Sequence, residues 1–69
     1  MADEDNAALK GTMRDLVEAS RRVRAARRLV REHALEDDPR YLRLVARLFE
    51  ALDMTEAALR EARRLRDTT

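Results

Sequence analysis

The chain has 69 residues, 42% of them charged, with a net charge of +1 and no cysteine. Residues 1–69 form one domain at most, and so short a chain buries too little surface to be very stable alone. Without cysteine, disulfides and thiolate zinc sites are excluded. The near-neutral charge gives no general attraction to nucleic acids or anionic membranes. Oligomerisation or docking onto a partner is therefore the expected route to stability.

The sequence shows no export or membrane signal. Its first ten residues, MADEDNAALK, are acidic and lack the apolar segment of a signal peptide. No apolar run approaches the roughly 20 residues that a membrane-spanning helix needs. We therefore expect a cytoplasmic protein.

The first predicted element is a long helix, from about residue 6 to residue 35, after a frayed tail at 1–5. Asp5 or Asn6 can cap it, because short side-chain oxygens accept hydrogen bonds from unpaired helical N–H groups. Large apolar residues recur every seven positions, with small residues at the companion positions, which indicates a line of contact with another helix. The large residues are Leu9, Leu16, Val23 and Val30, and the companions are Thr12, Ala19, Ala26 and His33.

The sequence EDDP at positions 36–39 separates this helix from a second one. A residue that precedes proline disfavours the helical conformation, whereas proline is well accepted at the first position of a helix. We therefore predict a turn at 36–38 and a second helix at 39–66, with Asp38 as its N-cap and Asp37 as the rival. So short a connection folds two helices antiparallel. The predicted fold class is all-α, an antiparallel two-helix hairpin.

The second helix has its own line of contact and more apolar residues beside it than one neighbouring helix can cover. The line that faces the first helix is Tyr41, Val45, Leu48, Leu52, Thr55, Leu59 and Ala62. On one side of this line lie Leu42 and Phe49, and on the other lie Leu44, Ala51, Ala58 and Leu65. Soluble proteins rarely leave so wide an apolar surface in water. We therefore predict that Leu42, Leu44, Phe49 and Leu65 bind a protein partner.

Two kinds of partner can cover this surface. A second copy of the hairpin would give a homodimeric four-helix bundle with twofold symmetry. A helix or groove of a different protein could bind in its place. The pattern by itself favours self-association, because small hairpins more commonly pair with themselves.

Arginines are concentrated in the first helix. Six of them lie between Ser20 and Glu32 without an intervening acid. Arg14, Arg21 and Arg28 form one column, with Arg24 beside it, which could contact the phosphates of nucleic acid. In the alternative interpretation the arginines form a solvated surface and pair with acids of the second helix. The candidate acids are Glu50, Asp53, Glu56 and Glu61. We favour this alternative, because the net charge is near zero and no aromatic residues alternate with the arginines to stack on bases.

No residue pattern indicates an enzyme, a metal site or a cofactor site. His33 lies near the end of the first helix without an apparent partner, which is more typical of a structural residue. Asp37 and Asp38 suit a turn better than acid–base catalysis. A single hairpin also offers little room for a substrate pocket. We therefore expect a non-enzymatic protein with no cofactor.

The segment DDPRYLRLVARLFEALDMTEAAL, residues 37–59, resembles the small helical-hairpin co-chaperones of type III secretion needle subunits. In that family the second helix opens just after the turn with an early aromatic residue, here Tyr41. An Ala-Leu pair follows, here Ala51-Leu52. The resemblance covers both helices in length but only this segment in sequence. It implies that the hairpin joins a larger tetratricopeptide-like chaperone and helps to keep an aggregation-prone needle subunit monomeric.

The alternative function is that of a Rop-like homodimeric four-helix bundle, which would bind RNA or DNA through its arginine-rich face. Nucleic acid is the less favoured partner on the sequence alone. The dense arginine block of the first helix has no counterpart that we can match in the co-chaperone family.

Overall fold

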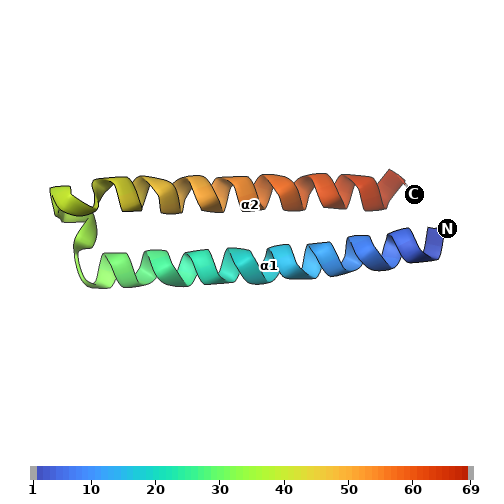
Figure 1. Ribbon diagram of the computed structural model, residues 1–69, viewed down its shortest axis with the longest axis horizontal. Helices are drawn as coiled ribbons and strands as arrows, with labels where there is room; N and C mark the ends of the chain where they lie inside the picture. The colour runs from blue at the N-terminus through green and yellow to red at the C-terminus, as the bar shows by residue number, and fades with distance from the viewer. Residues whose placement is uncertain (1, 69) are drawn as a thin grey trace.

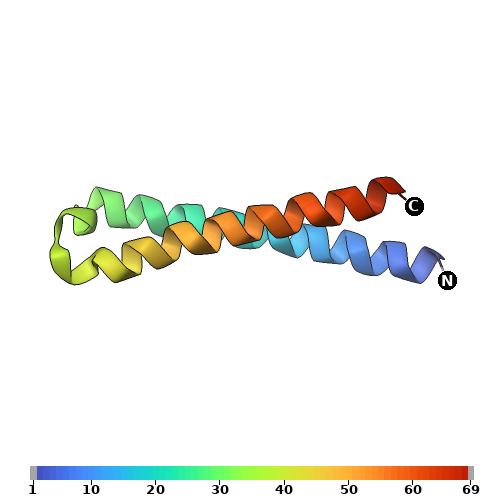
Figure 2. The same ribbon diagram turned by 90° about the horizontal axis from the view of Figure 1, so that it is seen from above.

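The computed structural model describes residues 2–68 and consists of two long antiparallel helices joined by a short turn (Figure 1). Helix α1 spans Ala2–Glu32 and helix α2 spans Leu42–Thr68. Two single-turn 3₁₀-helices connect them, η1 at Leu35–Asp37 and η2 at Pro39–Tyr41. The molecule measures 51 × 14 × 13 Å, and the two helices cross at a shallow angle when seen from above (Figure 2). The predicted all-α hairpin is therefore confirmed.

The start of α1 lies earlier than we predicted. The helix is already formed at Ala2, so residues 2–5 of the expected frayed tail belong to it. Met1, also part of that tail, lies outside the described residues. Asp5 and Asn6 consequently lie inside the helix and do not cap it. Acidic residues in the first turns, such as Glu4 and Asp5, favour this extension because they face the positive end of the helix dipole.

Ala34 ends α1 at Glu32 rather than near residue 35. Its backbone has φ 54° and ψ 30°, the left-handed helical region. The Ala34 N–H donates to the carbonyl of Arg31 at 3.1 Å, and the His33 N–H donates to that of Leu29 at 3.1 Å. A left-handed residue just after the last turn is a common way to end a helix, although glycine usually occupies that position. The chain can then leave the helix axis and enter η1.

Asp38 caps the second helical segment, as we predicted. Its Oδ1 accepts a hydrogen bond from the Arg40 backbone N–H at 2.9 Å, and Pro39 occupies the first position after it. The Arg40 guanidinium donates to the same carboxylate, with Nη2 2.7 Å from Oδ2. The predicted helix at 39–66 is divided, because residues 39–41 form η2 and the α-helix begins only at Leu42 and continues to Thr68.

The line of contact on α2 agrees with the prediction. Leu52, Leu59 and Ala62 are buried, and the remaining predicted members are half-buried. On α1 the large apolar residues also face α2, with Val30 buried and Leu9, Leu16 and Val23 half-buried.

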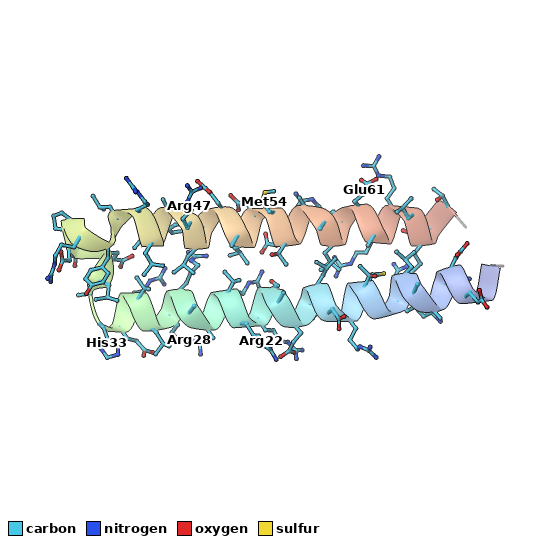
Figure 3. The ribbon with its side chains drawn as sticks, viewed as in Figure 1. Arg22, Arg28, His33, Arg47, Met54 and Glu61 are labelled. Carbon is cyan, nitrogen blue, oxygen red and sulfur yellow. The ribbon has the colours of Figure 1, made fainter. Side chains whose placement is uncertain are left out.

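Two of the four companion positions predicted on α1 were wrong. Thr12 and His33 are exposed, and His33 points away from α2 (Figure 3). Met13, Ser20 and Arg27 lie toward α2 in their place, with Ser20 only 8% exposed and the other two half-buried. Counted from Leu9, the contact residues of α1 are therefore spaced alternately four and three positions apart. The predicted spacing was three positions and then four. Ala19 and Ala26 are half-buried at its edge.

The ending of α1 at Ala34 gives a test of stability. An L-residue in the left-handed region is strained, and glycine is not. We expect Ala34→Gly to raise the free energy of unfolding by about 0.5–1 kcal/mol. The matched control is Ala25→Gly, an exposed site inside α1, which should lower it by about 1 kcal/mol. Urea denaturation followed by circular dichroism at one fixed protein concentration measures both. Destabilisation of equal size at both sites would contradict this account of the turn.

The Asp38 cap predicts a pH dependence. Hydrogen bonds from the Arg40 side chain and then from its backbone N–H hold the pKa of Asp38 below its ordinary value of 3.8. A carboxyl whose pKa is lower in the folded state stabilises the fold above its unfolded pKa, and this contribution is lost as the pH falls through the folded pKa. Wild type should therefore unfold at a higher temperature than Asp38→Asn at neutral pH. The difference between the two unfolding midpoints should disappear as the pH is lowered below 3.8. The matched control is Asp53→Asn, which removes an exposed acid from α2 and should change the midpoint at neutral pH less than Asp38→Asn does, because it removes no helix cap.

Candidate interaction surfaces

The contact between the helices divides the hairpin into two sides. The two helices are antiparallel and right-handed. On both of them, the residue directly after a contact position therefore lies on one side of the hairpin, and the residue directly before it lies on the other side. Arg21 follows the contact residue Ser20, and Arg60 follows Leu59. Both line one groove between the helices, as this geometry requires. Ala19 and Ala58 precede the same two contact residues and therefore lie on the opposite side.

The side that precedes the contact carries small apolar residues, and we call it the alanine face. Its members are Ala19 and Ala26 on α1 and Leu44, Ala51, Ala58 and Leu65 on α2. None of the six is charged, and the columns on both helices repeat every seven residues. Charged residues that also precede contact positions border this face, namely Asp15, Arg22, Arg47 and Glu61. Leu44 and Leu65 are 47% and 51% exposed, one near each end of α2. Small residues in the middle of such a surface allow the backbone of another helix to approach closely.

The side that follows the contact carries arginines from both helices, and we call it the arginine face. A groove of about 500 Å³ runs between the helices there. The residues that line it are Val17, Ser20, Arg21, Arg24, Glu56, Leu59, Arg60 and Arg63. A second depression of about 220 Å³ continues along α1 between Arg24, Arg27, Arg28 and Arg31. The two depressions share Arg24, so the basic surface is continuous over both.

The four predicted partner-binding residues remain exposed, but they lie on opposite sides of the hairpin. Leu42 and Phe49 are 58% and 44% exposed on the arginine face, and Leu44 and Leu65 belong to the alanine face. Phe49 also takes part in the hairpin itself, because the Arg27 guanidinium lies 4.2 Å from the centre of its ring. A cation held over an aromatic face is attracted by the ring quadrupole. Phe49 is therefore partly occupied by this intramolecular contact.

The predicted arginine column is only partly brought together. Arg21 and Arg24 line the groove. Arg28 lines the adjoining depression together with Arg24, on the side of α1 away from α2 (Figure 3). Arg14 lies 3.9 Å from the neighbouring Asp15. The expected pairing with α2 occurs for Arg24, whose Nη2 is 2.6 Å from Oε1 of Glu56.

The other acids of α2 do not reach the arginines of α1. Glu50 pairs with Arg47 at 2.9 Å, and Glu61 pairs with Arg64 at 2.6 Å, both within α2. Asp53 forms no ion pair among the residues whose side chains are described, 4–68. The predicted pairing of the arginines of α1 with acids of α2 is thus correct for Glu56 and wrong for Glu50, Asp53 and Glu61.

The sequence prediction did not identify four residues of this surface, namely Ser20, Arg60 and Arg63 of the groove and Arg27 of the adjoining depression. Ser20 and Arg27 occupy contact positions on α1 where apolar residues are usual. Arg60 and Arg63 belong to the basic end of α2, which the helix dipole alone could explain. The spacing of Arg60 and Arg63 could have indicated a shared surface, because residues three positions apart project from neighbouring turns of the same helix face.

Within residues 2–68, neither helix has a stretch long and apolar enough to cross a membrane. The same residues contain no group of three or more His, Asp or Glu side chains that could hold a metal ion. No protein-family model matches the sequence, and no curated protein or solved structure is significantly similar to it. The resemblance to the needle co-chaperones thus stays a prediction from the segment at 37–59.

The ion pair between Arg24 and Glu56 can be measured with a double-mutant cycle. Both side chains are partly exposed, at 61% and 35%, so solvent screens much of their attraction. We expect a coupling free energy of about 0.2–1 kcal/mol from Arg24→Ala, Glu56→Ala and the double variant. It should shrink in about 0.5 M salt. A coupling above roughly 2 kcal/mol would mean that another molecule shields the pair from water.

Proposed function

We propose that this protein is a non-enzymatic protein–protein interaction module that is completed by packing its alanine face against a second copy. The observation that carries the proposal is the small amount of apolar surface that the hairpin buries by itself. Only Val30, Leu52, Leu59 and Ala62 are buried among the described apolar residues, and no described side chain is less than 2% exposed. Large apolar side chains remain about half exposed at the same time. A chain of this size without disulfides needs further burial to be stable.

The alanine face suits a second copy better than the arginine face does. Its six residues carry no charge, and the charged residues that border it each have an ion-pair partner, so that two such faces can meet without burying an unpaired ion. Its small central residues allow close approach of the helices, and Leu44 and Leu65 supply larger contacts near the two ends. The net charge of +1 opposes association only weakly. Two hairpins joined in this way would form a four-helix bundle with twofold symmetry.

A heterologous helix could use the same face. This is what the resemblance to the needle co-chaperones implies, with a helix of a larger chaperone in place of the second copy. The two occupants differ in one measurable respect, because only self-association makes the mass of the purified protein depend on its own concentration.

Two glutamate substitutions on the alanine face test the proposal. Glutamate is nearly as good a helix former as alanine or leucine, so the helices themselves should persist. We expect wild type to be a dimer by light scattering, and Leu44→Glu with Ala58→Glu to weaken its dissociation constant by roughly a hundredfold or more, because each buried charge is costly. The control is Ala57→Glu, since Ala57 is exposed and lies two residues from the contact residues Thr55 and Leu59, at the back of α2. It should leave the dimer intact.

The same measurements distinguish a second copy from a heterologous helix as the molecule that covers the alanine face. Wild type that stays monomeric up to high concentration would contradict the second copy and favour a heterologous helix. A dimer that withstands both glutamates on the alanine face but dissociates with Phe49→Glu would place the interface on the arginine face instead.

A further inference from the structure

We propose that the groove between the helices is a binding site for a small organic polyphosphate of the nucleotide type. The site does not depend on self-association, because it lies on the arginine face, opposite the alanine face. Its volume of about 500 Å³ is within the range of pockets that hold small ligands. Four guanidinium groups surround it, from Arg21 and Arg24 on α1 and from Arg60 and Arg63 on α2.

The charges around the groove are not balanced within the chain. Glu56 is the one acid that lines it, and its carboxylate is engaged by Arg24 at 2.6 Å. Arg21, Arg60 and Arg63 have no carboxylate partner among the residues whose side chains are described. Three unpaired cations around one hollow repel each other, and a bound anion would relieve that repulsion.

Ser20 adds a hydrogen-bonding group to the groove. The residue lines the groove, and its hydroxyl makes no hydrogen bond to the described residues. No buried side-chain oxygen or nitrogen of the described residues lacks a hydrogen-bond partner, so Ser20 Oγ is accessible to solvent. An oxygen atom of a ligand placed between the arginines could accept a hydrogen bond from it.

The composition of the site favours phosphate over carboxylate. Guanidinium groups bind both anions through paired hydrogen bonds, but a single carboxylate would neutralise only one of three unpaired charges. A chain of phosphates carries several negative charges on oxygens that accept many hydrogen bonds. Val17 and Leu59 contribute apolar surface in the same groove, which suits the organic part of a nucleotide. The adjoining depression from Arg24 to Arg31 leaves room for further phosphates along α1.

Isothermal titration of the full chain with ATP, with inorganic triphosphate as a second probe, tests this site. We expect both to bind, and binding to weaken as salt is added because screening reduces the attraction. Removing Arg21 and Arg63 together, by Arg21→Ala with Arg63→Ala, should weaken binding roughly tenfold or more, since hydrogen bonds to charged groups are lost. Ser20→Ala should weaken it by a smaller factor.

The matched control is Arg47→Ala with Arg64→Ala. This control also removes two positive charges, both from α2. Arg47 points away from α1 (Figure 3), and neither Arg47 nor Arg64 lines the groove. Equal losses in the two double variants would mean that net charge alone attracts the ligand, and would overturn the site. Absence of ATP and triphosphate binding in wild type would do so as well. Binding of a single-stranded oligonucleotide without binding of ATP would assign the arginine face to nucleic acid and reject the small-ligand proposal.

Discussion

The narrow contact between α1 and α2 is the constraint on which the rest of this structure depends. Two helices that pack side by side touch along a line of side chains, one or two residues wide. Four apolar residues are buried along that line, namely Val30, Leu52, Leu59 and Ala62. Every other large apolar side chain must therefore lie at the edge of the contact or outside it. The contact does not constrain the residue types on the two sides of the hairpin, so these two surfaces can differ in charge and size of side chain.

The two sides do differ, and each agrees with one of the proposals. The alanine face is uncharged and carries small residues, so another helix can approach it without burying an ion. The arginine face combines three unpaired guanidinium groups with the solvent-accessible hydroxyl of Ser20 around one groove. Because the faces are opposite each other, a second copy on the alanine face would leave the groove open to a ligand. Phe49 belongs to the arginine face, where Arg27 covers its ring.

The turn and the contact line of α2 were predictable because they depend on local chemistry and on one clear repeat. Asp38 before Pro39 is a cap signal that needs no knowledge of the rest of the chain. The helix ending at Ala34 was not predictable, since alanine is the best helix former and carries no sign of a left-handed backbone. The companion positions on α1 were ambiguous for a different reason. A repeat of seven allows the second contact residue to follow the first by three or by four, and small residues at Ala19 and Ala26 made the wrong choice attractive.

The sequence by itself determined the two helices, the antiparallel turn and the excess of apolar residues on α2, because periodicity and capping act between residues close in the chain. Only the tertiary structure decided how far each helix is rotated about its axis. That rotation places Ser20 and Arg27 in the contact and puts Leu44 and Phe49 on opposite sides. It also brings Arg21 and Arg24 next to Arg60 and Arg63, which are far away in the sequence. Rotation is set by side-chain packing between the helices, where a few close contacts outweigh the preferences of either helix alone.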